Sequence, residues 1–328
     1  MEEQVAGVEQ GWWTKRLDID PIMSSSWLDS FSLTEETLRL LELMPNLEII
    51  TIPSFDNPIN HPVHQAWLVD VQLDLGKLAQ LRRVEWHGSG YDLLDLHRLT
   101  QLCTNLEHVA VTLQTSSEAS PDAVPITHDR IQTLLFNWHQ EFNVASPPFA
   151  GWSLPGLRHL SYFVHFGQSI LMLLPLLRTQ GAHIHSLEIP ILEQWVVFSY
   201  LDVVLPLVPN LNTIILDVFK TDFVGISNPG HANLCCVGWR LRTQSAMNDV
   251  MTLHAAVQYF NKALYPQLER IEIVHPDPLS TYTEWIAQNF PQEWNNLVDG
   301  QIPVFDYHGD TAVIPVEDED EENDEDQA

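Results

Sequence analysis

The sequence predicts an α/β fold in which one parallel sheet lines the concave face of a curved solenoid and helices cover the convex face. Three observations predict it. One pattern of spaced apolar residues, first seen at 46–52, returns seven more times along the chain. Residues before most copies are apolar at helical spacing, whereas the end of each copy has the two-residue period of a strand. Prolines precede several copies, where they end a helix and force a turn. Each unit is therefore predicted to be helix, turn and strand.

The eight copies share the pattern Leu-x-x-apolar-x-apolar, with Leu or Ile as the anchor. They are Leu47/Ile50/Ile52, Leu81/Val84/Trp86, Leu106/Val109/Val111, Leu157/Leu160/Tyr162, Ile184/Leu187/Ile189, Leu211/Ile214/Leu216, Leu234/Val237/Trp239 and Leu268/Ile271/Ile273. The anchors step by 34, 25, 51, 27, 27, 23 and 34 residues. Steps of about 20 to 30 residues are the period of leucine-rich repeats, whose units bury a core only when at least about three are stacked. The sequence thus predicts a leucine-rich-repeat solenoid of the ribonuclease-inhibitor-like kind.

Residues 1–36 precede the first complete copy and are irregular in pattern. Trp12, Trp13 and Trp27 stand out there. Large aromatics in this place favour an N-terminal cap over the exposed end of the first unit, the alternative being a partner-binding motif. Thr14-x-x-Leu17-x-Ile19 is a candidate for a worn ninth copy of the pattern.

The step of 51 residues between two anchors is about twice the usual length, so 107–156 either hides a degenerate copy or carries an insertion. Ile131, Leu134, Leu135 and Trp138 fall at i, i+3, i+4 and i+7, the spacing of an amphipathic helix. We expect this helix to be the outer half of a disguised unit.

The solenoid and its C-terminal cap are predicted to occupy 37–310. Apolar residues between Trp285 and Leu297 indicate a closing helix, and 302–305 indicates an added edge strand. Residues 311–328 form the tail, in which Glu317 to Asp326 holds nine acids and no base, a composition typical of disorder. The tail either solubilises the chain or attracts basic partners in a salt-dependent way.

Charge and cysteine content limit the partners and the compartment. The 328 residues include 15 basic and 44 acidic ones, a formal net charge of −29, which disfavours nucleic-acid binding because that depends on Lys and Arg at phosphates. The cytoplasm or nucleus is favoured because the chain has only three cysteines and does not start with a basic and then apolar leader. A membrane span is disfavoured because no apolar run reaches about 20 residues.

Signatures of catalysis and of metal binding are missing from the sequence. It contains no Gly-x-Ser-x-Gly, no phosphate-binding Gly-rich loop, no dinucleotide fingerprint and no Cys-x-x-Cys. His61 and His64 are close in sequence, but two histidines without further ligands do not make a metal site, and a solvated loop is the simpler interpretation. We therefore expect a binding protein without enzyme activity, metal or cofactor.

The candidate binding residues flank and split the apolar pairs, so they project from the concave face. They are Arg83, Glu85, His87, His108, His159, Ser161, Phe163, Glu188, Asp217, Arg240, Arg270 and Glu272. The set is mixed in sign. His108 and His159 occupy the same place in their units with His87 nearby, which indicates either a pH-sensitive or metal-binding row or simply exposed polar residues on a sheet.

The phrases Pro45-Asn46-Leu47-Glu48, Thr104-Asn105-Leu106-Glu107, Pro209-Asn210-Leu211-Asn212 and Pro266-Gln267-Leu268-Glu269 carry a family resemblance. They resemble the leucine-rich-repeat part of F-box proteins, particularly the divergent F-box-like proteins of mushroom-forming fungi, over about residues 13–310. The resemblance implies substrate recognition by the repeats, with an F-box docking a Skp-type adaptor of a ubiquitin ligase. Residues 1–40 lack the Leu-Pro-x-Glu opening of an F-box, so adaptor docking is not carried over.

A second resemblance gives the alternative function. A leucine-rich-repeat chain with an acidic tail is similar to the acidic nuclear phosphoprotein family of histone chaperones, although that family has fewer repeats and a longer tail. It implies binding of basic proteins such as histones.

Overall fold

All strands among the described residues belong to one parallel sheet. The computed structural model describes residues 14–18, 44, 46–52, 79–91, 93–113, 125–138, 149–164, 170–191, 197–218, 230–241, 259–260, 262–274 and 304–305. The eleven strands lie in the order of the chain, and every neighbouring pair is parallel. They are β1 (Arg16–Asp18), β2 (Ile49–Ile52), β3 (Arg83–Tyr91), β4 (His108–Leu113), β5 (Thr133–Trp138), β6 (His159–Val164), β7 (Ser186–Ile191), β8 (Thr213–Val218), β9 (Cys236–Leu241), β10 (Arg270–Val274) and β11 (Val304–Phe305).

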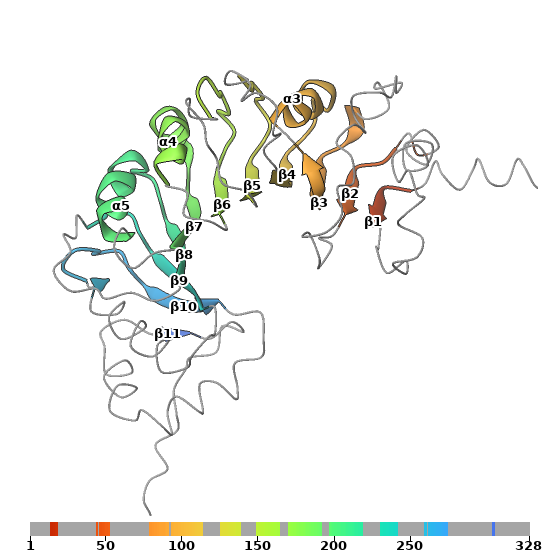
Figure 1. Ribbon diagram of the computed structural model, residues 1–328. Helices are drawn as coiled ribbons and strands as arrows, with labels where there is room; N and C mark the ends of the chain where they lie inside the picture. The colour runs from red at the N-terminus through yellow and green to blue at the C-terminus, as the bar shows by residue number, and fades with distance from the viewer. Residues whose placement is uncertain are drawn as a thin grey trace, which may run out of the picture.

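The sheet is curved, and the helices lie on its convex side (Figure 1). The described α-helices are α3 (Leu93–Leu102), α4 (Leu174–Gln180) and α5 (Val197–Val204), accompanied by the short 3-10 helices η2 (Ile170–Leu173), η3 (Gly181–His183) and η4 (Leu205–Leu207). The predicted α/β class with a parallel sheet is confirmed. None of the described helices is long and apolar enough to cross a bilayer.

The core lies between the sheet and this convex layer. Anchors such as Leu106 and Leu211 are fully buried, and so are the apolar pairs that follow them, for example Val109 and Val111 on β4. They pack with helix residues such as Leu96 of α3 in one continuous cluster. Because strand side chains alternate between faces, the residues between these apolar positions point to the concave side.

One predicted helix is wrong. Residues 133–138 form β5, paired in register with β4 and β6. Ile131, Leu134 and Phe136 are buried as a further copy of the repeat pattern, which divides the long step of 51 residues into 25 and 26. The apolar residues of this segment satisfy both periods, and the strand forms because β4 and β6 would otherwise leave open edges on either side.

The convex layer beside β5 and β6 contains extended chain in place of the predicted helix. Thr127 and Ser153 form an isolated parallel bridge, with Ser153 N donating to Ile126 O at 2.7 Å. Phe149 and Trp152 are buried here, with ring centroids 5.1 Å apart and an interplanar angle of 89°. Aromatic rings thus cover the sheet where the sequence predicted a helix for each unit, so the described helices are fewer than predicted.

The ends of the sheet were partly foreseen. Leu17 of the candidate ninth copy at 14–19 lies on β1 opposite Ile50, and residues 304–305, within the predicted edge strand at 302–305, form β11. The tryptophans of the N-terminal cap, the helix ahead of the first anchor, the histidines at 61 and 64, the closing helix and the acidic tail lie outside the described residues.

Backbone hydrogen bonds repeat from unit to unit. The carbonyl oxygen of Glu48, the residue after an anchor, accepts the amides of Arg82 and Arg83 at 2.8 and 3.1 Å. The same arrangement recurs at every unit from Lys15 to Cys235. This ladder holds each unit in the same register as the one before.

Two buried histidines connect neighbouring units. His128 and His231 each lie three residues before an anchor. Nδ1 of His231 accepts the amide of Asn233 at 3.3 Å, so the proton is on Nε2, which donates to the carbonyl of Val208 at 3.0 Å. His128 makes the equivalent bonds to the amide of Arg130 and the carbonyl of Cys103. These histidines are therefore structural.

Replacing either buried histidine should destabilise the fold. We expect His128→Ala and His231→Ala each to lower the free energy of unfolding by about 1–3 kcal/mol, because a hydrogen bond between units and a buried ring are lost. Urea denaturation followed by circular dichroism measures this. His183→Ala, at an exposed histidine of η3, is the control and should leave the midpoint unchanged. Equal effects at all three positions would contradict the structural role.

Candidate functional site

The concave face of the sheet carries the predicted binding residues, and the strand register arranges its side chains in lines that cross the strands. The first line consists of Arg16, Ile49, Arg83, His108, Thr133, His159, Ser186, Thr213, Cys236 and Arg270. The second line consists of Asp18, Thr51, Glu85, Ala110, Leu135, Ser161, Glu188, Ile215, Gly238 and Glu272.

The two lines differ in the sign of their charges. In the first line every charged residue is an arginine, with His108 and His159 beside them. In the second line every charged residue is Asp or Glu. The lines are two residues apart along each strand, about 6.6 Å. The face is mixed in sign, as predicted, and these two lines of it are sorted, whereas Asp217 and Arg240 lie opposite each other at the next position along β8 and β9.

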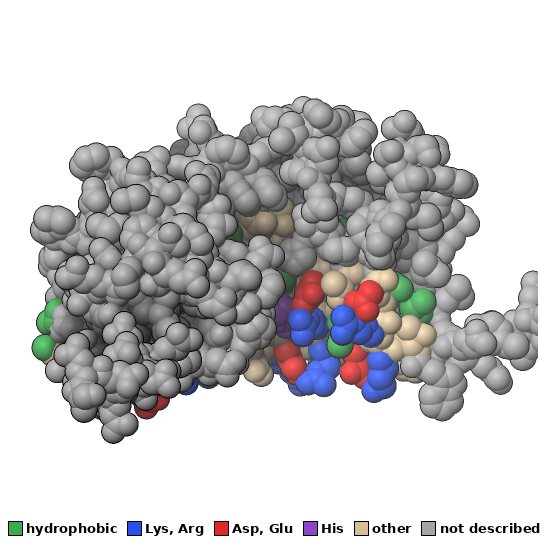
Figure 2. Space-filling model, turned by 90° about the horizontal axis from the view of Figure 1, so that it is seen from below, with side chains coloured by type: hydrophobic (Ala, Val, Ile, Leu, Met, Phe, Trp, Pro, Cys, Tyr) green, Lys and Arg blue, Asp and Glu red, His purple; other side chains and the backbone are tan. Residues whose placement is uncertain are grey.

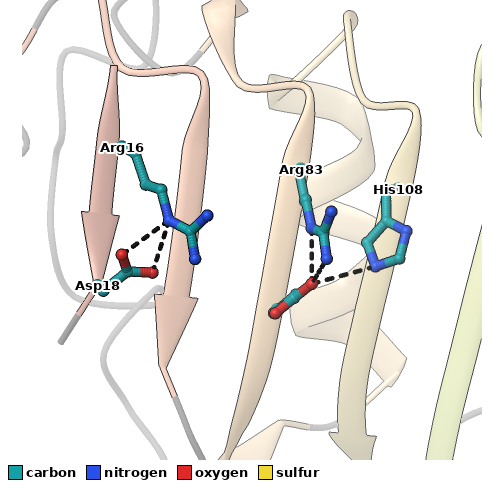
Figure 3. Close-up of polar contacts among 5 residues, drawn as sticks. Arg16, Asp18, Arg83 and His108 are labelled. Atoms are coloured by element: carbon teal, nitrogen blue, oxygen red, sulfur yellow. Dashed lines mark hydrogen bonds and ion pairs between the residues drawn. The ribbon is translucent and has the colours of Figure 1, made fainter. Parts of the chain in front are cut away.

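The sorting is visible on β1, β3 and β4 (Figure 3). Arg16 Nε donates to Asp18 Oδ2 at 2.7 Å, Arg83 pairs with Glu85, and His108 Nε2 lies 3.5 Å from Glu85 Oε1. The hydrogen bond from Arg16 holds the pKa of Asp18 below its ordinary value and raises the pKa of Arg16 itself. Both groups face water, so the pair contributes little to stability.

The rim, formed by the residues just before each strand, has a different order of charge. Lys15 Nζ lies 2.7 Å from Glu48 Oε1, and Arg82 Nη2 lies 2.8 Å from Glu107 Oε2, so charges alternate along the rim over the first four strands. The hydrogen bond from Lys15 lowers the pKa of Glu48. Seen from the concave side, acidic and basic side chains gather over the N-terminal strands of the sheet (Figure 2).

A second cluster joins four predicted residues from β6, β7 and β9. Ser161 Oγ donates to Glu188 Oε2 at 2.7 Å, and Arg240 Nη2 lies 2.5 Å from Glu188 Oε1. The guanidinium carbon of Arg240 is 5.0 Å from the centre of the Phe163 ring, a cation–π distance. Both carboxylate oxygens of Glu188 thus have partners, and the cluster holds a fixed shape on the face.

The two predicted histidines of the row do lie in one line, but β5 separates them. His108 and His159 flank Thr133, so their strands are about 9.6 Å apart. Burial lowers the pKa of His159, and the nearby His185 lowers it further. Within the described part of the chain, no three His, Cys, Asp or Glu side chains are grouped as a metal site requires.

The remaining predicted residues lie at the C-terminal end or have undescribed side chains. Arg270 pairs with Glu272 on β10. Desolvation, together with the charge of Glu272, raises the pKa of the neighbouring Cys236 thiol to about 11. His87 belongs to β3 beyond Trp86, where the register with β4 shifts, and Asp217 lies opposite Arg240.

Sequence reasoning missed the concave residues of two strands. Arg16 and Asp18 lie on β1, and Thr133 and Leu135 lie on β5. The signal for β5 was present, because 131–136 fits the repeat pattern with Ile131 as its anchor. For β1 the candidate ninth copy at 14–19 pointed to the correct residues.

No protein-family model matches the chain, and no curated protein matches it.

His159 should titrate below the ordinary histidine pKa of 6.5. Because the unfolded chain then takes up this proton first, the histidine's contribution to stability is complete above pH 6.5 and falls as pH drops through the lower folded pKa. NMR titration of the imidazole resonances measures the pKa. We expect His185→Gln to raise the pKa of His159 part of the way, since desolvation, the larger cause, remains. His183→Gln should leave it unchanged, and the same pKa in both variants would contradict the assigned cause.

Glu188→Gln should destabilise the fold more than the same change at the rim. Side chains of Glu188 and Arg240 are only 13% and 30% exposed, so removing the carboxylate charge leaves a partly buried guanidinium without its counter-ion. We expect the free energy of unfolding to fall by about 1–3 kcal/mol. Glu48→Gln, whose partner Lys15 is 69% exposed, is the control and should have a much smaller effect. Equal urea midpoints for the two variants would refute this ranking.

Proposed function

We propose that the chain is a leucine-rich-repeat solenoid of the ribonuclease-inhibitor-like kind, whose concave face binds another protein and which has no catalysis of its own. One observation carries the proposal. Successive strands turn all their apolar anchors to the convex side and present charged, polar and half-exposed apolar side chains on the other. Ten strands, β1 to β10, span about 43 Å at the usual spacing, the scale of a protein surface and larger than a small ligand.

The pairing of polar groups on the concave face supports binding over catalysis. Arg16 with Asp18, Arg83 with Glu85 and Arg240 with Glu188 neutralise one another. An activated nucleophile instead needs a base held against it. The buried Cys103 thiol, whose pKa burial raises to about 12, packs as an apolar core group. This use of cysteine supports a reducing compartment, the cytoplasm or nucleus.

Within this function we favour substrate recognition in an F-box-like ubiquitin-ligase context. The support is the resemblance of the phrases before four of the anchors to F-box leucine-rich repeats. Contact with a Skp-type adaptor is proposed only for a chain that also carries an F-box, because residues 1–40 lack its opening motif.

A chaperone or scaffold for basic proteins such as histones is the second candidate. The observation that favours it is the run of nine acids from Glu317 to Asp326 in a chain of net charge −29. Such a charge attracts basic partners strongly at low salt and weakly at high salt.

Site-specific photo-crosslinking in extracts of the source cells tests the proposed function. A photoreactive amino acid placed at Thr133, on the concave side of β5, should crosslink to a partner protein. The same amino acid at Arg178, exposed on α4, is the control on the convex side and should not. Crosslinks only from position 178, or from neither position, would refute binding at the concave face.

The identity of the crosslinked protein separates the two candidates. A ubiquitin-ligase substrate, recovered together with a Skp-type adaptor when an F-box is present, supports the first. Histones recovered at low salt and lost at high salt support the second. An intrinsic turnover activity abolished by changing a concave residue would overturn both.

A further inference from the structure

The sorted charges on the concave face have a direction. On three strands, β1, β3 and β10, a base comes first and an acid follows two residues later, as Arg16-x-Asp18, Arg83-x-Glu85 and Arg270-x-Glu272. Across the strands, the register places Arg16, Arg83 and His108 in one line and Asp18 and Glu85 in the other, with the uncharged residues of β2 between β1 and β3. A partner that crosses the strands along the arc therefore meets a basic line on one side and an acidic line on the other.

The spacing of the two lines fits an α-helix. The lines are about 6.6 Å apart, whereas a helix with its side chains is about 10–12 Å wide, so its two flanks lie over the two lines. Arg16 and Arg83 are two strands apart, about 9.6 Å, as are Asp18 and Glu85. Seven residues of helix rise about 10.5 Å, which matches this repeat along each flank.

Small side chains lie beside Glu85 in the second line, whereas in the first line Ile49 lies between Arg16 and Arg83. On β2, between Arg16/Asp18 and Arg83/Glu85, the second line holds the half-buried Thr51. On β4 it holds the buried Ala110. Arg16, Asp18 and Arg83, which Figure 3 shows on β1 and β3, are about half exposed or more, so a partner can contact them.

We propose that the concave face binds an amphipathic α-helix of its partner, lying across the strands, with acidic side chains on one flank and basic side chains on the other. The acidic flank faces Arg16, Arg83 and His108, and the basic flank faces Asp18 and Glu85. The Arg16–Asp18 pair and the Arg83 guanidinium are exposed, so exchanging their contacts for pairs with the helix costs little, while Glu85, 18% exposed, offers the helix a smaller surface. This inference rests on the proposed function and adds the partner's shape and charge order to it.

Two synthetic helices test the charge order directly. Both are stapled peptides of about 20 residues, the length that spans β1 to β7, with the same composition and no net charge. In the sorted peptide, Glu occupies one flank at every seventh residue and Lys the other. In the mixed peptide, one central Glu and Lys are exchanged. Fluorescence anisotropy with the full chain at low salt should show the sorted peptide binding at least about threefold tighter, and high salt should remove the difference.

A charge swap in the protein provides the reciprocal test. Arg83→Glu combined with Glu85→Arg keeps the net charge and the local pair but reverses their order on β3. We expect the sorted peptide to bind this variant at least about threefold more weakly than it binds the unmodified chain. The mixed peptide should then bind the variant as tightly as the sorted peptide does. The matched control, Arg82→Glu with Glu107→Arg, makes the same swap at the rim and should leave the ratio of the two affinities unchanged.

Circular dichroism establishes that each variant is folded, and Arg16→Asp with Asp18→Arg replaces the β3 swap if that variant does not fold. Equal binding of the two peptides to the unmodified chain, or binding of neither, overturns the proposed helix. A β3 or β1 swap that leaves the preference intact overturns it as well. None of these results affects the photo-crosslinking test, so failure of this inference and failure of the proposed function are distinguishable.

Discussion

The register between neighbouring parallel strands is the constraint on which the rest of the structure depends. Side chains alternate between the two faces of a strand, so a slip of one residue would move every buried side chain of that strand to the concave face and every concave side chain into the core. On β3 such a slip would turn Val84 and Trp86 to water and move Arg83 and Glu85 into the core. Burying an arginine and a glutamate away from water is costly even when they are paired. The apolar pattern and the ladder of backbone bonds after each anchor therefore specify the same alignment.

Because that alignment repeats, a short motif on single strands becomes a property of the whole face. If the register varied from strand to strand, the Arg-x-acid motifs of β1, β3 and β10 would form only local ion pairs. In this sheet they produce separate basic and acidic lines. The pairing within each strand also limits repulsion along a line, since every arginine on these strands has an opposite charge closer than the next like charge. The electrostatic order of the surface thus follows from the same register that buries the core.

The apolar residues of the sequence were sufficient to predict most strands, because their burial is decided within each unit. The strand at 133–138 was missed because Ile131, Leu134, Leu135 and Trp138 fit a helical period as well, and only the neighbouring strands decide between the two. His128 and His231 could not be recognised as connections between units, since their acceptors depend on how consecutive units are stacked. The same holds for the concave surface. Sequence spacing placed its residues on one face, but their sorting by sign required the register through β5.

For the proposed recognition at this face, the distribution of charge makes the order of the charges more important than their sum. The chain has 15 basic residues, and seven of them lie on the concave face or its rim: Lys15, Arg16, Arg82, Arg83, Arg158, Arg240 and Arg270. Acids at the same positions of the described units are nearly equal in number: Asp18, Glu48, Glu85, Glu107, Glu188, Asp217, Glu269 and Glu272. The surplus that gives a net charge of −29 therefore lies elsewhere in the chain.

A partner that approaches this nearly balanced surface gains little from net charge alone. A partner whose charges are in complementary order is attracted, whereas a partner with the wrong order places like charges together and is repelled. Specificity therefore comes from both attraction and repulsion. The two proposed modes of binding, long-range attraction of basic proteins and short-range selection at the concave face, would thus depend on different parts of the chain.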